Sequence, residues 1–141
     1  MFARLLAARK DEEGFTLIEL LVVIIIIGIL AAIAIPVFLN QRASAAKAAL
    51  TSDARNGAVQ IETYFTDNQA YPDDVITSGV PGAGEVLVEL STNSTVGAYT
   101  GSGTSTSYTY CVLAVGGAAD GWGVTYDSSA AGVGAPDPDG C

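Results

Sequence analysis

The stretch GFTLIELLVVIIIIGILAAIAIPVF, residues 14–38, decides how the rest of this chain is arranged. No charged or strongly polar side chain occurs from Leu20 to Leu39. As a helix that rises ~1.5 Å per residue, these positions reach across the ~30 Å hydrocarbon core of a bilayer. The sequence therefore predicts one helix that can span a membrane.

Glu19 is the single carboxylate at the entrance of this apolar run. An ionised group inside lipid or a protein core is unfavourable by several kcal/mol unless something neutralises it. We therefore treat Glu19 as a functional candidate whose partner has to be identified.

The residues before the run set its orientation. Three basic residues between positions 4 and 10 favour a cytoplasmic N-terminus, with the rest of the chain outside. A secretory signal cleaved near Ala43-Ser44-Ala45 is an alternative, as is a plain N-terminal anchor. Three acids at positions 11–13 and Glu19 speak against a secretory signal, and an anchor tolerates them better.

The charge distribution excludes several classes of function. The chain carries a net charge of −9, and beyond Arg55 it has ten acidic residues and no basic one. Such a surface repels nucleic acid, whose binding depends on Lys and Arg. With no histidine and two cysteines, neither a zinc site nor a Cys/His nucleophile can be assembled, so we expect no metal and no cofactor.

Beyond the apolar run, apolar residues recur at spacings of three and four as one helical stripe. Asp53, Arg55, Gln60 and Glu62 fall between these positions, which predicts an amphipathic continuation of the same helix over residues 15–65. The turn-forming residues 67–72, which end in Pro72, close it. The stripe consists of Leu39, Ala43, Ala46, Leu50, Ala54, Gly57, Ile61 and Phe65.

After Pro72 the composition changes to Gly, Ser, Thr and β-branched residues. Residues 85–90, 107–115 and 122–126 are predicted as strands, the last two joined by a hairpin over residues 116–121. Because the head has few large apolar residues, we expect its sheet to pack on the outer half of the helix. The predicted fold class is α+β, with a ladle shape: a long N-terminal helix and a small antiparallel β-sheet head.

Residues 14–38 resemble the N-terminus of type IV pilins, most closely the type IVa major pilins, and of their secretion-system relatives, the pseudopilins. The resemblance rests on the Gly14-Phe15 junction, on Glu19 four residues later, and on Gly28 and Pro36 within the run. It implies cleavage between Gly14 and Phe15 by a prepilin peptidase, N-methylation of Phe15 and polymerisation into a helical filament. The implied division is a leader at residues 1–14, a helix at 15–66 whose half at 15–39 is hydrophobic, and a head at 67–141.

The resemblance also supplies a partner for Glu19. Cleavage leaves a cationic amine at Phe15, and filament packing brings the amine of one subunit near Glu19 of a neighbour, so that each neutralises the other. The alternative is that Glu19 is favoured by the dipole and amine of its own helix. Gly28 and Pro36 interrupt the regular pattern and are expected to kink the helix. In the family that the chain resembles, the segment between such residues can loosen when subunits pack.

Cys111 and Cys141 lie outside the membrane in this topology, where oxidising conditions favour a disulfide over two free thiols. Their pairing also resembles the C-terminal disulfide loop of pilins. Asp137 and Asp139 could donate oxygens to calcium, but carboxylates beside proline and glycine more often form a solvated turn. Residues 100–106 form a hydroxyl-rich loop that is open to glycosylation.

The implied function is a structural subunit of a type IV pilus serving adhesion, motility or DNA uptake. The implied partners are other copies of the chain, the prepilin peptidase and methyltransferase, membrane lipid before assembly, and an inner-membrane assembly machinery with a cytoplasmic ATPase. The protein would be a single-pass membrane protein before assembly and part of an extracellular filament afterwards.

Two alternatives remain. One is the major pseudopilin of a type II secretion system, and the other is a membrane-anchored extracytoplasmic protein of different function. An enzyme would have to use paired acids such as Asp73 and Asp74, which in a Pro-rich loop usually face solvent. We therefore expect no catalytic site.

Overall fold

The computed structural model describes residues 14–130 and 132–141 of the chain. The predicted leader therefore lies outside the described residues, apart from Gly14. The chain divides into two compact units, Met1–Phe38 and Leu39–Cys141, which are described separately below.

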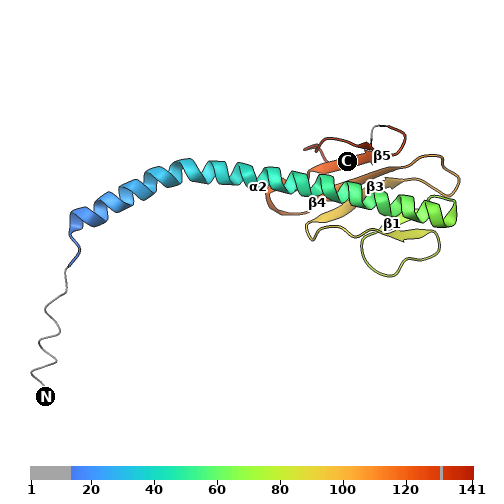
Figure 1. Cartoon of the computed structure of the whole chain (residues 1–141), viewed down its shortest axis with the longest axis horizontal. Coiled ribbons are helices and arrows are strands. Elements are labelled where there is room, and N and C mark those ends of the chain that lie inside the picture. The colour runs from blue at the N-terminus through green and yellow to red at the C-terminus, as the bar shows by residue number, and fades with distance from the viewer. Residues whose placement is uncertain (1–13, 131) are drawn as a thin grey trace, which may run out of the picture. The chain divides into compact units, whose positions relative to one another are not determined.

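Helix α2 (Leu17–Asn68) is one continuous element of 52 residues that belongs to both units (Figure 1). The sequence predicts a helix over residues 15–65, so its existence is confirmed and its ends move by two and three residues. At the C-terminal end, Gln69 adopts a positive φ of 56° and its N–H donates to Phe65 O over 2.7 Å. A residue in this left-handed conformation is a common way for a helix to stop. Gly28 and Pro36 both lie inside the helix, without a break in its secondary structure.

A four-stranded antiparallel sheet forms the main part of the second unit (Figure 1). Its strands follow each other in chain order: β3 (Ser94–Thr100), β4 (Thr109–Ala114), β5 (Gly123–Asp127) and β6 (Gly132–Val133). Strands β4 and β5 correspond to the predicted strands at 107–115 and 122–126. The predicted hairpin joins them and contains one short 3-10 turn, η1 (Gly117–Ala119).

A second, two-stranded sheet corrects the prediction for residues 85–90. Strand β2 (Glu85–Leu87) ends three residues earlier than predicted and pairs in parallel with β1 (Asp74–Ile76), which the sequence did not reveal. Beyond β2, Val88 N still donates to Ile76 O over 2.8 Å, and Glu89 N then donates to the Gln60 side chain of α2 over 3.1 Å. The head is therefore antiparallel in its larger sheet only.

The hydrophobic core lies between the outer half of α2 and one face of the four-stranded sheet. Tyr108, just before β4, and Tyr110, Val112 and Ala114 within it are buried, as the period of two predicts. They meet the middle of the predicted helical stripe, and this packing confirms the α+β class. The helix residues of this core cluster are Leu50, Ala54 and Ile61.

The helix and the sheet approach each other closely at Gly57. A Cβ atom added there would lie 2.5 Å from the hydroxyl of Tyr110, which is itself fully buried. Glycine is thus required by space and not by backbone conformation. Among the described residues, the Tyr110 hydroxyl is the one buried side-chain polar atom without a hydrogen-bond partner.

An aromatic cluster closes the end of the core next to the last turns of α2. Tyr108 lies at its centre, with ring centroids 5.0 Å from Tyr71, 5.6 Å from Tyr126 and 6.1 Å from Tyr99. The hydroxyl of Tyr99 donates to Pro72 O over 2.9 Å and so fixes the chain where it leaves the helix. Burial raises the pKa of Tyr99 to about 12 and also raises the pKa of Tyr108.

Candidate functional site

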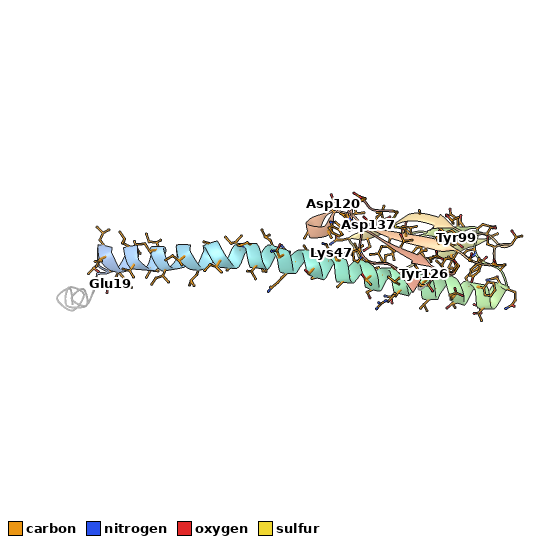
Figure 2. The ribbon with its side chains drawn as sticks, turned by 90° about the horizontal axis from the view of Figure 1, so that it is seen from above. Glu19, Lys47, Tyr99, Asp120, Tyr126 and Asp137 are labelled. Atoms are coloured by element: carbon orange, nitrogen blue, oxygen red, sulfur yellow. A yellow bond between two sulfur atoms is a disulfide. The ribbon has the colours of Figure 1, made fainter. Side chains whose placement is uncertain are left out.

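The N-terminal half of α2 is an apolar surface that no other described part of the chain covers. Its large side chains are between 46% exposed, at Val22, and 88% exposed, at Phe15. Figure 2 shows them standing out around this half of the helix, with Glu19 near its start. We call the following residues the apolar N-terminal surface: Phe15, Leu17, Ile18, Leu20, Leu21, Val22, Val23, Ile24, Ile25, Ile26, Ile27, Ile29, Leu30, Ile33, Ile35, Val37, Phe38 and Leu39.

The helix that carries this surface is long and apolar enough to cross a membrane. Its most apolar window has a mean hydropathy of 3.3, and none of that window is buried within the chain. An element of this kind fits single-pass membrane anchoring.

Glu19 caps the first turn of its own helix. Its Oε2 atom accepts one hydrogen bond from Thr16 N over 2.8 Å and another from Thr16 Oγ1 over 2.7 Å. In return, Glu19 N donates to Thr16 Oγ1 over 3.3 Å. This reciprocal pair is a capping box, which satisfies backbone donors that the helix leaves unpaired at its start.

The capping box places the carboxylate at the edge of an apolar hollow. Phe15, Ile18, Val22 and Val23 line this open depression together with Glu19. Oε2 accepts both hydrogen bonds of the carboxylate, and within the described residues Oε1 accepts none. The sequence anticipated that the helix start favours Glu19, but it did not reveal the role of Thr16, although the pattern Thr-x-x-Glu is a capping-box signature.

Gly28 and Pro36 have no structural explanation within the single chain. A Cβ atom added at Gly28 would meet nothing within 4 Å. Pro36 lies in the helix interior, where proline removes one backbone hydrogen bond. Their expected roles in subunit packing therefore remain predictions.

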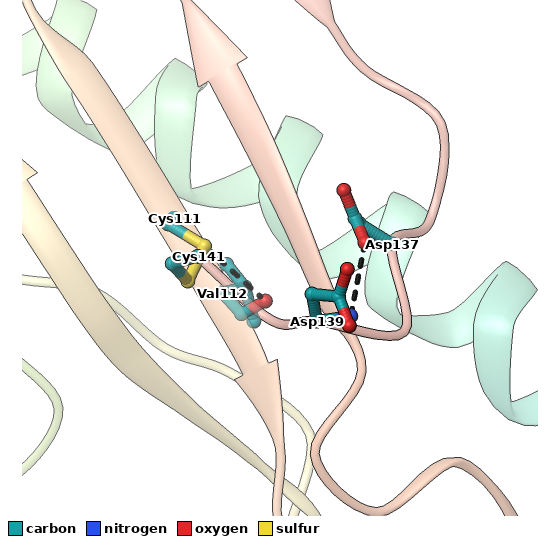
Figure 3. The surroundings of a disulfide bond; sticks show 5 residues. All are labelled: Cys111, Val112, Asp137, Asp139 and Cys141. Atoms are coloured by element: carbon teal, nitrogen blue, oxygen red, sulfur yellow. Dashed lines mark hydrogen bonds between the residues drawn. A yellow bond between two sulfur atoms is a disulfide. The ribbon is translucent and has the colours of Figure 1, made fainter.

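The disulfide between Cys111 and Cys141 is present, and it ties the C-terminus to β4 with 6.1 Å between the two Cα atoms (Figure 3). The neighbouring turn is closed by Asp139 N, which donates to Asp137 Oδ1 over 2.9 Å. Asp137 also exchanges two backbone hydrogen bonds with Gly123 of β5, of 2.8 and 2.9 Å. These acids thus build a turn, and no three His, Cys, Asp or Glu residues converge on a metal position in the described part of the chain.

Asp53 is a buried residue that the helical pattern placed on the polar side of α2. Its side chain is only 5% exposed and accepts hydrogen bonds from Ser91 N, Ser91 Oγ and Ser94 Oγ. The prediction is wrong here because the loop after β2 folds over this part of the helix. No local signal indicates that contact, since the serines lie 38 and 41 residues away in sequence.

Asp73 and Asp74 are exposed, and their carboxylates accept backbone hydrogen bonds from Gly103 N and Val75 N. Trp122 is half-buried beneath the ammonium group of Lys47, which lies 3.3 Å from the centre of its ring. Each of these groups therefore has a structural role within the fold.

The comparisons with known proteins agree with the geometry of the N-terminal segment. The prokaryotic N-terminal methylation motif matches residues 9–35. The chain is 36% identical to the type IV major pilin protein PilE of Neisseria gonorrhoeae over 77 residues, which is 53% of this chain and 45% of PilE. The N-terminal half of the chain is thus similar to that of type IV pilins.

Other relatives come from two functional groups. The chain is 39% identical to the type II secretion system core protein G of Pseudomonas aeruginosa over 64 residues, 45% of each chain. It is also 39% identical to the fimbrial protein EcpC of Eikenella corrodens over 74 residues, 51% of this chain and 47% of EcpC. The matches span less than half the length of these relatives. No solved structure matches the chain.

Proposed function

We propose that this chain is a structural subunit of a type IV pilus that is cleaved between Gly14 and Phe15, N-methylated on Phe15 and polymerised into a helical filament. The filament would serve adhesion, motility or DNA uptake, and the subunit itself would have no catalytic role. The observation that carries the proposal is the apolar N-terminal surface, which the described residues leave uncovered and which has the carboxylate of Glu19 near its start.

Such a surface requires an apolar environment at every stage. Before assembly, lipid covers it and the chain is a single-pass membrane protein. After extraction from the bilayer, only equivalent helices of other copies can cover the whole circumference. A filament core of packed N-terminal helices meets this requirement, and it places the heads outside.

Within that core, Glu19 requires a positive partner. Cleavage after Gly14 creates an amine on Phe15, and the amine of one copy neutralises Glu19 of a neighbour. The bonds from Thr16 support this pairing, because they fix the carboxylate at the helix start and leave Oε1 available among the described residues. Gly28 and Pro36 then contribute by local loosening of the helix when the copies pack.

The proposed partners follow from this pathway. A prepilin peptidase and methyltransferase act on the leader, residues 1–14, and on Phe15, which starts the helical part at 15–66. An inner-membrane assembly machinery with a cytoplasmic ATPase supplies the force, because this sequence has no phosphate-binding loop. The head at residues 67–141 forms the outer surface of the filament.

The second candidate is a major pseudopilin of a type II secretion system, which the similarity to the core protein G of Pseudomonas aeruginosa favours. Both candidates share cleavage, methylation and polymerisation. Electron micrographs of sheared surface material, probed with an antibody to this chain, separate the two: long labelled surface fibres identify a pilin, and their absence from cells that assemble the chain identifies a pseudopilin.

The N-terminal peptide of native material tests the proposal as a whole. We expect its mass to correspond to a chain that begins at a methylated Phe15. Replacement of Gly14 should preserve the full-length chain, and Glu19→Leu should leave the protein in the membrane without filaments. A native chain that begins at Met1 would contradict the proposal and favour a membrane-anchored protein of another function.

A further inference from the structure

Three large apolar residues are exposed in the described part of the second unit beyond Leu39: Val59, Val80 and Val115. Two of them, Val59 and Val80, lie on different elements of this unit. Val59 lies in a groove on the outer side of α2, with 65% of its surface exposed, and Val80 lies on the loop between β1 and β2, with 91% exposed. Since both remain exposed, no contact within the chain covers either valine.

The groove runs between α2 and β5 and has a volume of about 370 Å³. Ala58 and Val59 form its apolar part, and Tyr126 of β5 lies beside the helix on the opposite side (Figure 2). Arg55 and Glu62 bring one charge of each sign to its lining. We call this feature the α2 groove, and its residues are Arg55, Ala58, Val59, Glu62, Thr63, Thr66 and Tyr126.

Arg55 brings a positive charge to this groove that the chain itself does not use. It is exposed, and among the described residues no hydrogen bond or ion pair involves it. All ten charged residues after it in the sequence are acidic. When heads of this composition lie side by side, Arg55 is a cation that a neighbouring acidic head can reach.

The loop between β1 and β2, residues 77–84, projects beside β1 (Figure 1) and is closed at its base. Asp73 N donates to Gly84 O over 2.7 Å, and Glu85 Oε2 accepts a 2.8 Å hydrogen bond from Gly82 N. Gly79 and Gly84 have positive φ values of 100° and 83°, which other residues rarely adopt. The loop is thus a preorganised apolar tip with carboxylates at its base, and we call it the Val80 loop.

We propose that the Val80 loop of one copy docks into the α2 groove of a second copy, with Val80 against Val59 and the Glu85 carboxylate beside Arg55. The inference deepens the proposed function, on which it rests, by naming a contact between heads. A second copy is the occupant because its apolar Val80 tip and the Glu85 carboxylate at the base of the loop match Val59 and the cation of Arg55 in the groove. The two surfaces do not overlap, so every copy can use both at once, and such head-to-tail contacts propagate along a filament.

A photo-crosslinking residue at position 59 tests the contact in cells that produce the full chain. We expect a crosslinked dimer whose junction maps by mass spectrometry to residues 77–85 of the second copy. The matched control places the same residue at Asn56, which is exposed on α2 but does not line the groove. A junction in another segment, a crosslink to another protein, or equal yields at positions 56 and 59 would overturn the proposal.

Charge exchange provides a second measurement. Arg55→Glu brings like charges together and should lower the yield of the 59-to-loop crosslink at least about ten-fold, and Arg55→Glu with Glu85→Arg should restore most of it. Glu85→Gln keeps an acceptor for Gly82 N and removes the charge, so it separates a loss of charge from a misfolded loop. A charge exchange that restores nothing, while Glu85→Gln has no effect, contradicts the pairing.

The same cells distinguish this proposal from the filament proposal. Filaments that form while the crosslink maps elsewhere would leave the pilus function intact and reject the docking contact. The expected crosslink in cells without filaments would retain the contact and reject the pilus function.

Discussion

The hydroxyl of Ser94 donates a 2.6 Å hydrogen bond to the carboxylate of Asp53, although the two residues lie 41 positions apart in the sequence. Ser91 donates two further hydrogen bonds to the same carboxylate, from its hydroxyl and its backbone N–H. The loop that leads into β3 is therefore attached to the middle of α2 by one buried side chain. This attachment fixes where the four-stranded sheet begins on the helix.

Asp53→Ala should destabilise the second unit by roughly 2–3 kcal/mol, because it leaves buried donors without their charged acceptor. Thermal or denaturant unfolding of the full chain in detergent measures the loss. Ser52→Ala, an exposed neighbour on the same helix, is the matched control and should change stability by less than about 0.5 kcal/mol. Equal stability of the Asp53 variant and this control would show that the attachment contributes nothing.

Gly57→Ala should destabilise the fold by about 1–3 kcal/mol, because the added methyl group would overlap the ring of Tyr110. Tyr110→Phe should be nearly neutral or stabilising, since it removes a buried hydroxyl that has no partner among the described residues. Unfolding of both variants in one experiment checks the two signs. A large loss in Tyr110→Phe would mean that the hydroxyl has an important partner, such as a buried water.

Stability should fall above pH 10 because of the buried tyrosines. Burial raises the pKa of Tyr99 from 10.0 to about 12, so the unfolded chain releases this proton at a lower pH than the folded chain. The full stability is present below pH 10 and is lost as the pH rises through 12. Tyr99→Phe should flatten this slope while removing the hydrogen bond to Pro72 O. A pH series of unfolding midpoints measures both effects, and identical slopes for the two proteins would contradict this assignment.

The elements with a strong local period could be predicted from the sequence. The apolar run and the helical stripe through Leu50, Ala54 and Ile61 indicate α2, and the alternation from Tyr108 to Ala114 indicates β4 and its buried face. In each case, the spacing of apolar residues follows directly from which side of the element faces the core. The N-terminal candidate residues were recognisable because their motif is short and contiguous.

The elements that depend on distant partners could not be predicted. Strand β3 is rich in small and hydroxyl residues, and its register shifts between Val96 and Ala98, so no period of two runs through it. The parallel pairing of β1 with β2 depends on the loop between them. The burial of Asp53 depends on Ser91 and Ser94, which follow β2 in the sequence. The helical period of α2 alone assigns Asp53 to the solvent side.

Removal of the disulfide through Cys111→Ser and Cys141→Ser should destabilise the second unit by roughly 3–4 kcal/mol in the chain-entropy description of a cross-link that spans 30 residues. The backbone pairing of Asp137 with Gly123 remains and should keep part of the C-terminal segment in place. Protease sensitivity reports this directly. Cleavage should increase after residue 127, while the sheet from β3 to β5 stays resistant, and a uniform loss of resistance would show that the disulfide supports the whole unit.

Glu19→Gln separates the capping contacts of Glu19 from its proposed pairing with a neighbouring subunit. A glutamine side chain still provides an oxygen for Thr16 N and Thr16 Oγ1, so the capping box and the start of α2 should persist. The charge that we propose to neutralise the amine of a neighbouring Phe15 is lost. Filament yield should therefore fall at least about ten-fold with unchanged membrane insertion and unchanged helicity by circular dichroism, since loss of one partner strands a buried charge.

Glu19→Leu provides the comparison for this variant, because it removes the charge and the capping oxygen together. If Glu19→Gln assembled normally and only Glu19→Leu failed, the carboxylate would act through its own helix. The pairing between subunits predicts instead that the two variants fail alike, and that Thr16→Val, which keeps the charge and removes the hydroxyl bonds, assembles at a yield closer to the native chain.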